Sequence, residues 1–109
     1  MVSEKIQQLV AQAQSYQQHL QAVMAQKEAL SIQLMEISRA LEELGKPGDD
    51  DVFKMAGPIL VKVKRAESSK ELESKKEIIN LRLRSLAKNE TRLKEQMDGM
   101  REKLENAGG

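Results

Sequence analysis

The sequence predicts a mostly α-helical protein, in which two long helices form an antiparallel coiled coil and are joined by one β-hairpin. Two long segments carry apolar residues on a seven-residue repeat, which is the pattern of a coiled coil. A short block rich in β-branched residues separates them and is typical of strands. One Tyr and one Phe are the only aromatic residues among 109, so a compact globular core is not expected. We interpret residues 1–109 as one domain.

The overall charge and composition argue against several functions. The 18 basic and 17 acidic residues leave a net charge of +1, which favours neither nucleic acid nor an anionic membrane as a partner. There is no Cys, hence no disulfide and no thiolate metal site. No apolar run approaches about 18 residues, and no secretory signal pattern opens the chain. We expect a cytoplasmic protein that is not an enzyme and needs no cofactor, since the lone His19 has no catalytic companion.

The first predicted helix covers residues 3–45. Its heptad starts at Ile6, and all but one of its a and d positions are apolar or Tyr. Ser3 is placed to cap the start, Gly45 is expected to end the helix as an αL C-cap, and Pro47 prevents its resumption. The a positions are Ile6, Ala13, Leu20, Lys27, Leu34 and Leu41, and the d positions are Leu9, Tyr16, Val23, Leu30, Ile37 and Leu44.

A turn-rich linker over residues 46–51 leads to the predicted hairpin, residues 52–63. The three aspartates of the linker fit a solvated loop better than a Ca²⁺ site, which needs alternating oxygens and a distal Glu. Gly57-Pro58 forms the turn between two short strands.

Apolar side chains populate both faces of this hairpin, whereas a sheet exposed on one side would alternate with polar residues. An isolated two-stranded hairpin is marginal in water, and burying an aliphatic side chain is worth about 1.5–3 kcal/mol. We therefore expect the hairpin to pair with hairpins of other chains. The alternative is that it folds back onto its own helices. The predicted assembly residues are Val52, Phe53, Met55, Gly57, Ile59, Leu60, Val61 and Val63.

A second short linker, residues 64–67, precedes the second predicted helix, residues 68–106. Ser68 and Glu71 have the spacing of a capping box. The heptad then restarts, with two charged residues in the seam. The d positions are Leu72, Ile79, Leu86, Leu93 and Met100, and the a positions are Lys76, Leu83, Glu90, Met97 and Leu104.

The two heptads predict how the helices meet. Antiparallel packing in one register brings Leu41 opposite Leu72 and puts Lys27 and Glu90 in adjacent layers, where they can partner each other. A slip by one heptad keeps the same neighbours, so this register is a preference. Four apolar residues lie off the seam and are candidates for contacts with neighbouring subunits: Ile32, Met35, Ile78 and Leu81.

The chain resembles the β class of prefoldin over almost its whole length. The most specific part is residues 52–62, VFKMAGPILVK, which is similar to that family's hairpin, with Phe53 where many members have Tyr. Residues 70–77 and the heptads of residues 83–93 match less specifically. A single hairpin suits the β class, because the α class carries two. The resemblance implies a hexamer of α-class and further β subunits, whose hairpins form intersubunit β-barrels and whose coils hold unfolded client proteins and pass them to a group II chaperonin without ATP.

The resemblance and the heptads together place a second site at the free end of the coil, about 60 Å from the hairpin. There we expect frayed turns to offer apolar groups, including flexible Met, to clients. The competing interpretation is that these are plain seam residues. A structural or tethering coiled coil and a nucleic-acid-associated one remain alternative functions. The predicted client-binding residues are Val2, Ile6, Leu9, Val10, Ala13, Met97, Met100, Leu104 and Ala107.

Overall fold

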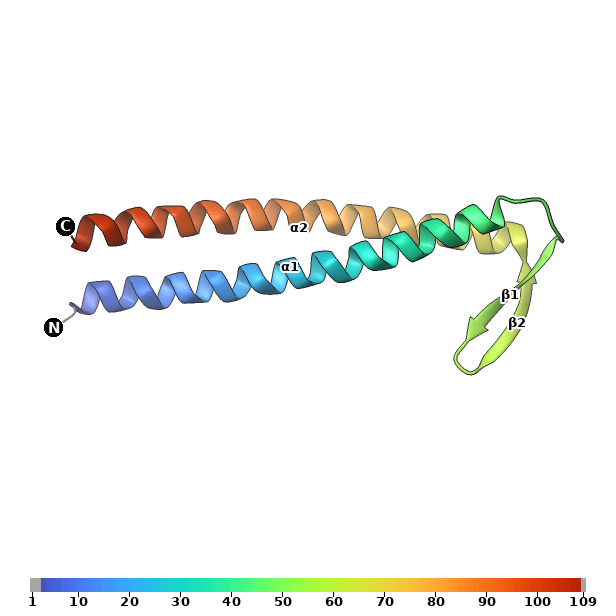
Figure 1. The fold of residues 1–109 in the computed structure, drawn as a ribbon, viewed down its shortest axis with the longest axis horizontal. Coiled ribbons are helices and arrows are strands. Elements are labelled where there is room, and N and C mark those ends of the chain that lie inside the picture. The colour runs from blue at the N-terminus through green and yellow to red at the C-terminus, as the bar shows by residue number, and fades with distance from the viewer. Residues whose placement is uncertain (1–2, 109) are drawn as a thin grey trace. The chain divides into compact units, whose positions relative to one another are not determined.

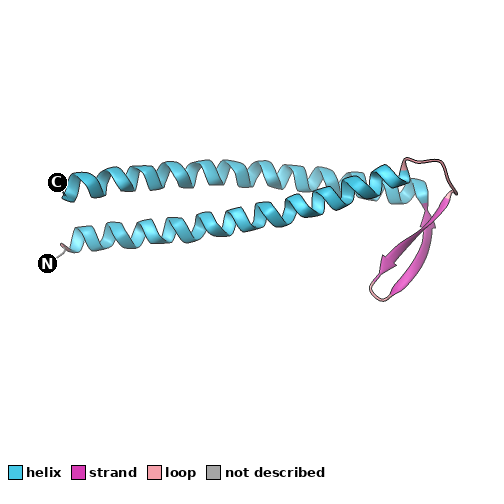
Figure 2. Ribbon diagram, in the orientation of Figure 1, coloured by secondary structure: helices cyan, strands magenta, loops and turns pink. Residues whose placement is uncertain are grey.

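The computed structural model describes residues 3–108 and has four elements in chain order. These are helix α1 (Glu4–Leu44), strand β1 (Asp51–Ala56), strand β2 (Ile59–Lys64) and helix α2 (Arg65–Gly108) (Figure 1). The predicted arrangement, two long helices with one antiparallel hairpin between them, is confirmed (Figure 2). The strands form a two-stranded sheet.

The chain divides into two compact units. The hairpin unit is Leu30–Arg82, and the terminal unit combines the residues up to Ala29 with those from Leu83 onward. Each unit contains a stretch of α1 and a stretch of α2. In the terminal unit the two helices are linked by an ion pair between Lys27 and Glu90. In the hairpin unit the Arg65 guanidinium, at the start of α2, binds the carbonyl of Leu44, the last residue of α1.

The predicted heptads coincide with the buried stripes of both helices. Every a and d residue of α1 is partly buried, and almost all other described residues of α1 are exposed. Among the described residues, the apolar core is four side chains of α2, spaced seven residues apart at successive d positions. Those four are Ile79, Leu86, Leu93 and Met100. The seam is therefore largely apolar, narrow and partly open to solvent, as expected when only two helices pack together.

The sequence predicted the start of α1 correctly but not the way in which the helix ends. Ser3 caps the start as expected, because its Oγ accepts a hydrogen bond from the N–H of Ile6 at 3.2 Å. The αL C-cap predicted at Gly45 is wrong, since among the described residues only Gly57 is a glycine with positive φ. The N–H of Gly45 instead donates to the carbonyl of Leu41 at 3.0 Å. The αL turn is not needed because the carbonyl of Leu44 binds Arg65.

The start of α2 also differs from the prediction. The linker expected at residues 64–67 is absent, because Lys64 ends β2 and Arg65 begins the helix. The N–H of Arg65 donates to the carbonyl of Asp50 at 2.7 Å, so the chain passes from the hairpin into the helix without a break. Ser68 consequently lies inside α2 and is not its N-cap. Glu71, its predicted capping partner, binds Lys54 and Lys75.

The hairpin closes through the predicted Gly57-Pro58 turn. Ala56 pairs with Ile59, and the antiparallel register continues to Asp51 opposite Lys64, one residue further at each end than predicted. Gly57 has φ +60°, a left-handed conformation that favours glycine. Proline at the next position has negative φ, so the loop is a type II′ turn, whose twist matches that of the flanking strands.

Candidate functional site

One face of the hairpin is apolar towards the turn and open to solvent there. Directly paired residues share a face and successive residues alternate between faces. Phe53, Met55 and Leu60 therefore lie together, with 67%, 70% and 64% of their surface exposed. Toward the base, Asp51 on the same face forms ion pairs with Lys64 at 3.0 Å and Lys62 at 3.5 Å. This face is thus polar at the base of the hairpin and apolar towards the turn.

The opposite face of the hairpin turns its base toward the helices. Val52 and Val63 form a pair there and are each half-buried, whereas Ile59 near the turn is 60% exposed. Lys54 lies on this face and its Nζ donates to Glu71 of α2 at 2.9 Å. The chain's own helices therefore cover the base of one face and leave the rest of the hairpin uncovered.

The two edges of the hairpin offer backbone groups as well as side chains. In a hairpin with a two-residue loop, the residues that flank the loop form a hydrogen-bonded pair, and such pairs alternate along the ladder. Ala56 and Ile59 are that pair here. The backbone N–H and C=O groups of Phe53, Met55 and Leu60 consequently point away from the partner strand. The open apolar face and the free edges belong to the same residues, a combination that favours the addition of further strands.

The ion pair between Lys54 and Glu71 fastens the hairpin to α2 and was not foreseen from sequence. The two residues are 17 positions apart in different elements, and both side chains are about half exposed. The hydrogen bond from Lys54, with its charge, lowers the pKa of Glu71, and Lys75 acts in the same direction. The pair lies in a groove between hairpin and helices, whose apolar lining includes Leu44 and Leu72.

The predicted client-binding residues of the terminal unit have unequal exposure. Val2 lies outside the described residues. Met100 is buried at 5% exposure, whereas Val10 and Ala107 are exposed. The others are half-buried in the seam: Ile6, Leu9, Ala13, Met97 and Leu104. Only part of the predicted set is accessible while the coil is closed.

The start of α1 and the end of α2 lie at the same end of the terminal unit (Figure 1). A shallow groove of about 460 Å³ runs between the two helices there. Its lining combines the apolar Leu9 and Ala107 with Lys5, Lys103 and Asn106. The coil end thus offers a small apolar surface bordered by two cations.

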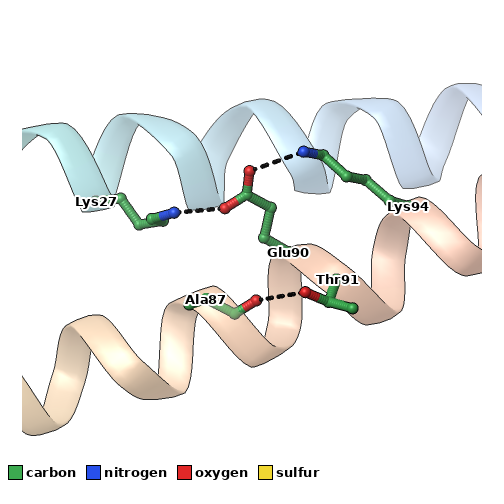
Figure 3. A network of polar contacts seen from close by, with 5 residues as sticks. All are labelled: Lys27, Ala87, Glu90, Thr91 and Lys94. Carbon is green, nitrogen blue, oxygen red and sulfur yellow. Dashed lines mark hydrogen bonds and ion pairs between the residues drawn. The ribbon is translucent and has the colours of Figure 1, made fainter.

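A charged layer interrupts the seam of the terminal unit, as the heptads predicted. Lys27 of α1 donates to Oε2 of Glu90 in α2, and Lys94 lies 3.1 Å from the other carboxylate oxygen (Figure 3). Next to this layer, the Thr91 hydroxyl donates to the carbonyl of Ala87 within the helix. The hydrogen bond from Lys27, followed by that from Lys94, lowers the pKa of Glu90. This arrangement partners Lys27 and Glu90 with each other within the seam.

Two classes of site are not found in the part of the chain that the structure describes. Among residues 3–108, no group of three or more His, Cys, Asp or Glu side chains is placed to hold a metal ion. None of the described helices combines the length and the apolar character that crossing a membrane requires.

Comparison with known proteins identifies the class to which this fold belongs. The model of the prefoldin subunit family matches residues 7–108, and the chain belongs to this family of chaperone subunits. Two relatives within the family are β subunits. It is 42% identical to prefoldin subunit beta of Archaeoglobus fulgidus over 103 residues, which cover 94% of this chain and 89% of the relative. It is 34% identical to prefoldin subunit beta of Pyrococcus furiosus over 97% of this chain and 92% of that protein.

Solved structures agree with this assignment. The crystal structure of the prefoldin beta subunit from Thermococcus strain KS-1 superposes with a TM-score of 0.86 at 31% sequence identity, and the match covers 98% of this chain and 95% of that one. The prefoldin beta2 subunit from the same strain has the same fold, with a TM-score of 0.73 at 16% identity, over 83% of this chain and 97% of that one.

Proposed function

We propose that this chain is the β-class subunit of an ATP-independent holdase. Its hairpin assembles with α-class and further β-class subunits into a hexamer through intersubunit β-barrels. Its coil ends hold unfolded proteins and deliver them to a group II chaperonin. The observation that carries the proposal is the open hairpin, because Phe53, Met55 and Leu60 combine exposed side chains with free strand edges.

The assembly role is supported by the apolar surface of the hairpin that the helices of the chain leave exposed. Large exposed apolar patches on soluble proteins mark interaction sites. Strand addition would satisfy the outward backbone groups and bury the apolar face in one step.

The assembly role is tested by mass measurement of the chain alone and mixed with the α-class prefoldin subunit of the same organism. We expect the double variant Phe53→Ser, Leu60→Ser to weaken assembly by more than about a hundredfold, because two apolar side chains lose their burial. The matched control is Met24→Ser, which removes an apolar side chain that is 50% exposed on the part of α1 that belongs to the terminal unit. A hexamer of unchanged stability in the double variant would exclude the hairpin as the assembly site.

Client binding is assigned to the coil ends. Val10 and Ala107 are exposed there, and Leu9 lines the groove between the helices. Each end offers only a small apolar area, so a single end binds weakly. Several ends on one hexamer then gain affinity through avidity. Met100 would join the binding surface only where the last turns of the helices separate.

Substitutions that leave the seam intact test the client role. Val10 and Met24 both occupy e positions of α1 and are 41% and 50% exposed. We expect Val10→Ser to weaken client binding by about 1 kcal/mol, or fivefold, at each end, and avidity to multiply the loss. Met24→Ser is the control and should suppress aggregation of an unfolded protein as well as the unaltered hexamer. Equal suppression by both variants would count against the exposed coil ends.

The seam residues of the predicted set need a second experiment. The triple variant Ile6→Ser, Leu9→Ser, Met100→Ser should preserve the hexamer and abolish suppression of aggregation. Because these residues also stabilise the seam, helix content must be followed by circular dichroism. Suppression that persists in a hexamer of this variant would refute binding by the seam residues.

A further inference from the structure

The connector between α1 and the hairpin is held by one side chain from beyond the hairpin. The Arg65 guanidinium donates from Nη1 to the carbonyls of Leu44, at 2.7 Å, and Lys46, at 3.0 Å. Its Nε donates to the carbonyl of Asp49 at 2.7 Å. The backbone N–H of the same residue donates to Asp50 at 2.7 Å. Arg65 therefore holds both ends of a connector that has no regular secondary structure.

The chemistry of arginine suits this position. The planar guanidinium presents several N–H donors in a rigid fork, whereas the ammonium of lysine is a compact point charge. Its positive charge lies at the C-terminus of α1, where the helix dipole is negative and where the last turn carries no basic residue of its own. Arg65 is half-buried, and its hydrogen bond to Leu44 is partly shielded from water, whereas those to Lys46 and Asp49 are exposed.

Gly48 provides the space that this guanidinium occupies. A Cβ at Gly48 would lie 2.5 Å from Nη2 of Arg65, closer than a carbon and a nitrogen can approach. Any residue other than glycine must therefore displace the guanidinium. Because the obstacle is the end of a long side chain, the backbone can keep its course while the hydrogen bonds are lost.

We propose that Arg65 is a positioning residue for assembly, which fixes the base of the hairpin so that its apolar face is oriented before a partner binds. This inference rests on the proposed assembly function of the hairpin. Fixing the backbone of a flexible connector costs conformational entropy, and a connector that is already fixed does not add that cost to association. Lys54 and Glu71 form a second, more exposed attachment of the same hairpin to α2.

The test compares three variants by hydrogen–deuterium exchange of residues 46–64 and by affinity for the α-class subunit. We expect Arg65→Ala to speed exchange and weaken assembly by about tenfold each, without changing the thermal unfolding of the helices. Gly48→Ala should act in the same direction although it retains the charge. Arg65→Lys should lie in between, since its ammonium reaches fewer carbonyls. The control is Arg84→Ala, an exposed site on α2 with the same change in charge.

Two outcomes separate this inference from the function on which it rests. Unchanged exchange and affinity in Arg65→Ala, while Phe53→Ser with Leu60→Ser prevents assembly, would overturn the role of Arg65 alone. Assembly that also survives the hairpin substitutions would overturn the proposed function. If Arg65→Ala reduces helix content, Gly48→Ala decides, and unaltered exchange and affinity in that variant would refute the proposal.

Discussion

The ammonium of Lys27 lies 2.5 Å from Oε2 of Glu90, across a seam that is otherwise almost entirely apolar. The carboxylate is the better shielded partner, with 16% of its side chain exposed against 34% for Lys27. A charge in such a position costs desolvation, which its partner offsets. Removal of one partner should therefore destabilise the coil more than removal of both.

Glu90→Leu should destabilise the coil and lower its thermal midpoint by several degrees, because Lys27 keeps its charge in the seam without a partner. Lys27→Leu combined with Glu90→Leu should recover the loss or exceed the original stability, since leucine suits both a positions. Thermal unfolding by circular dichroism gives the complete double-mutant cycle. Losses that simply add in the double variant would contradict a coupled pair.

Acid should remove the contribution of Glu90 to stability. Hydrogen bonds from Lys27 and Lys94 hold its pKa below the ordinary value of 4.5. A carboxyl with a lowered pKa in the folded state stabilises that state above its unfolded pKa, and the contribution is lost as pH falls through the folded pKa. We expect the difference in thermal midpoint between the unaltered chain and Glu90→Gln to be largest near neutral pH and to shrink as the pH falls below about 4. An equal difference in thermal midpoint at neutral pH and below pH 4 would exclude ionisation of Glu90 as the source of this pH dependence.

Two glycine-to-alanine substitutions should have opposite signs. Gly57→Ala places a side chain at φ +60°, which costs about 1–2 kcal/mol of hairpin stability although no atom lies within 4 Å. Gly99→Ala lies inside α2, where a Cβ also meets nothing within 4 Å, so it should stabilise the helix by about 0.5–1 kcal/mol. Hydrogen exchange of the hairpin amides measures the first effect and thermal unfolding measures the second. Destabilisation by both substitutions would mean that the helix at Gly99 needs glycine for another reason.

Two leucines of α2 provide a test of where the helix packs. Leu86 is 7% exposed and Leu81 is 54% exposed. Leu86→Ala should cost about 2–4 kcal/mol, because a seam of two helices loses one of its few buried side chains. Leu81→Ala should change the free energy of unfolding by less than about 0.5 kcal/mol. Urea unfolding compares the two, and similar losses would indicate that Leu81 is covered in solution.

The sequence predicted the helices, their seam and the hairpin because each follows from a local or periodic rule. A heptad defines a buried face without knowledge of the partner. In the antiparallel register that the heptads favoured, Lys27 and Glu90 fell in adjacent layers, which predicted their ion pair. Gly57-Pro58 specifies a turn from two residues alone. These features need no information about the path of the chain elsewhere.

The role of Arg65, the end of α1 and the start of α2 were not predicted, because they depend on contacts between residues far apart in the sequence. Its three carbonyl partners lie on α1 and on an irregular connector, and no spacing rule connects such positions to an arginine 16 to 21 residues later. The αL C-cap at Gly45 and the capping box at Ser68 were sound local rules. Neither applies here, because the N–H of Arg65 at the start of α2 donates to the carbonyl of Asp50. The carbonyl of Leu44 at the end of α1 accepts a hydrogen bond from the Arg65 guanidinium. Exposure at the coil ends likewise depends on packing that a heptad does not specify.

Within residues 3–108, the four buried side chains all belong to α2, at Ile79, Leu86, Leu93 and Met100, while every seam residue of α1 keeps some contact with water. The two halves of this coil are therefore unequal in how much sequence variation they can absorb. In a saturation-mutagenesis map of fitness, positions that do not tolerate substitution should recur every seven residues along α2. The same seven-residue periodicity should be weaker along α1, where more substitutions are tolerated and can accumulate during evolution.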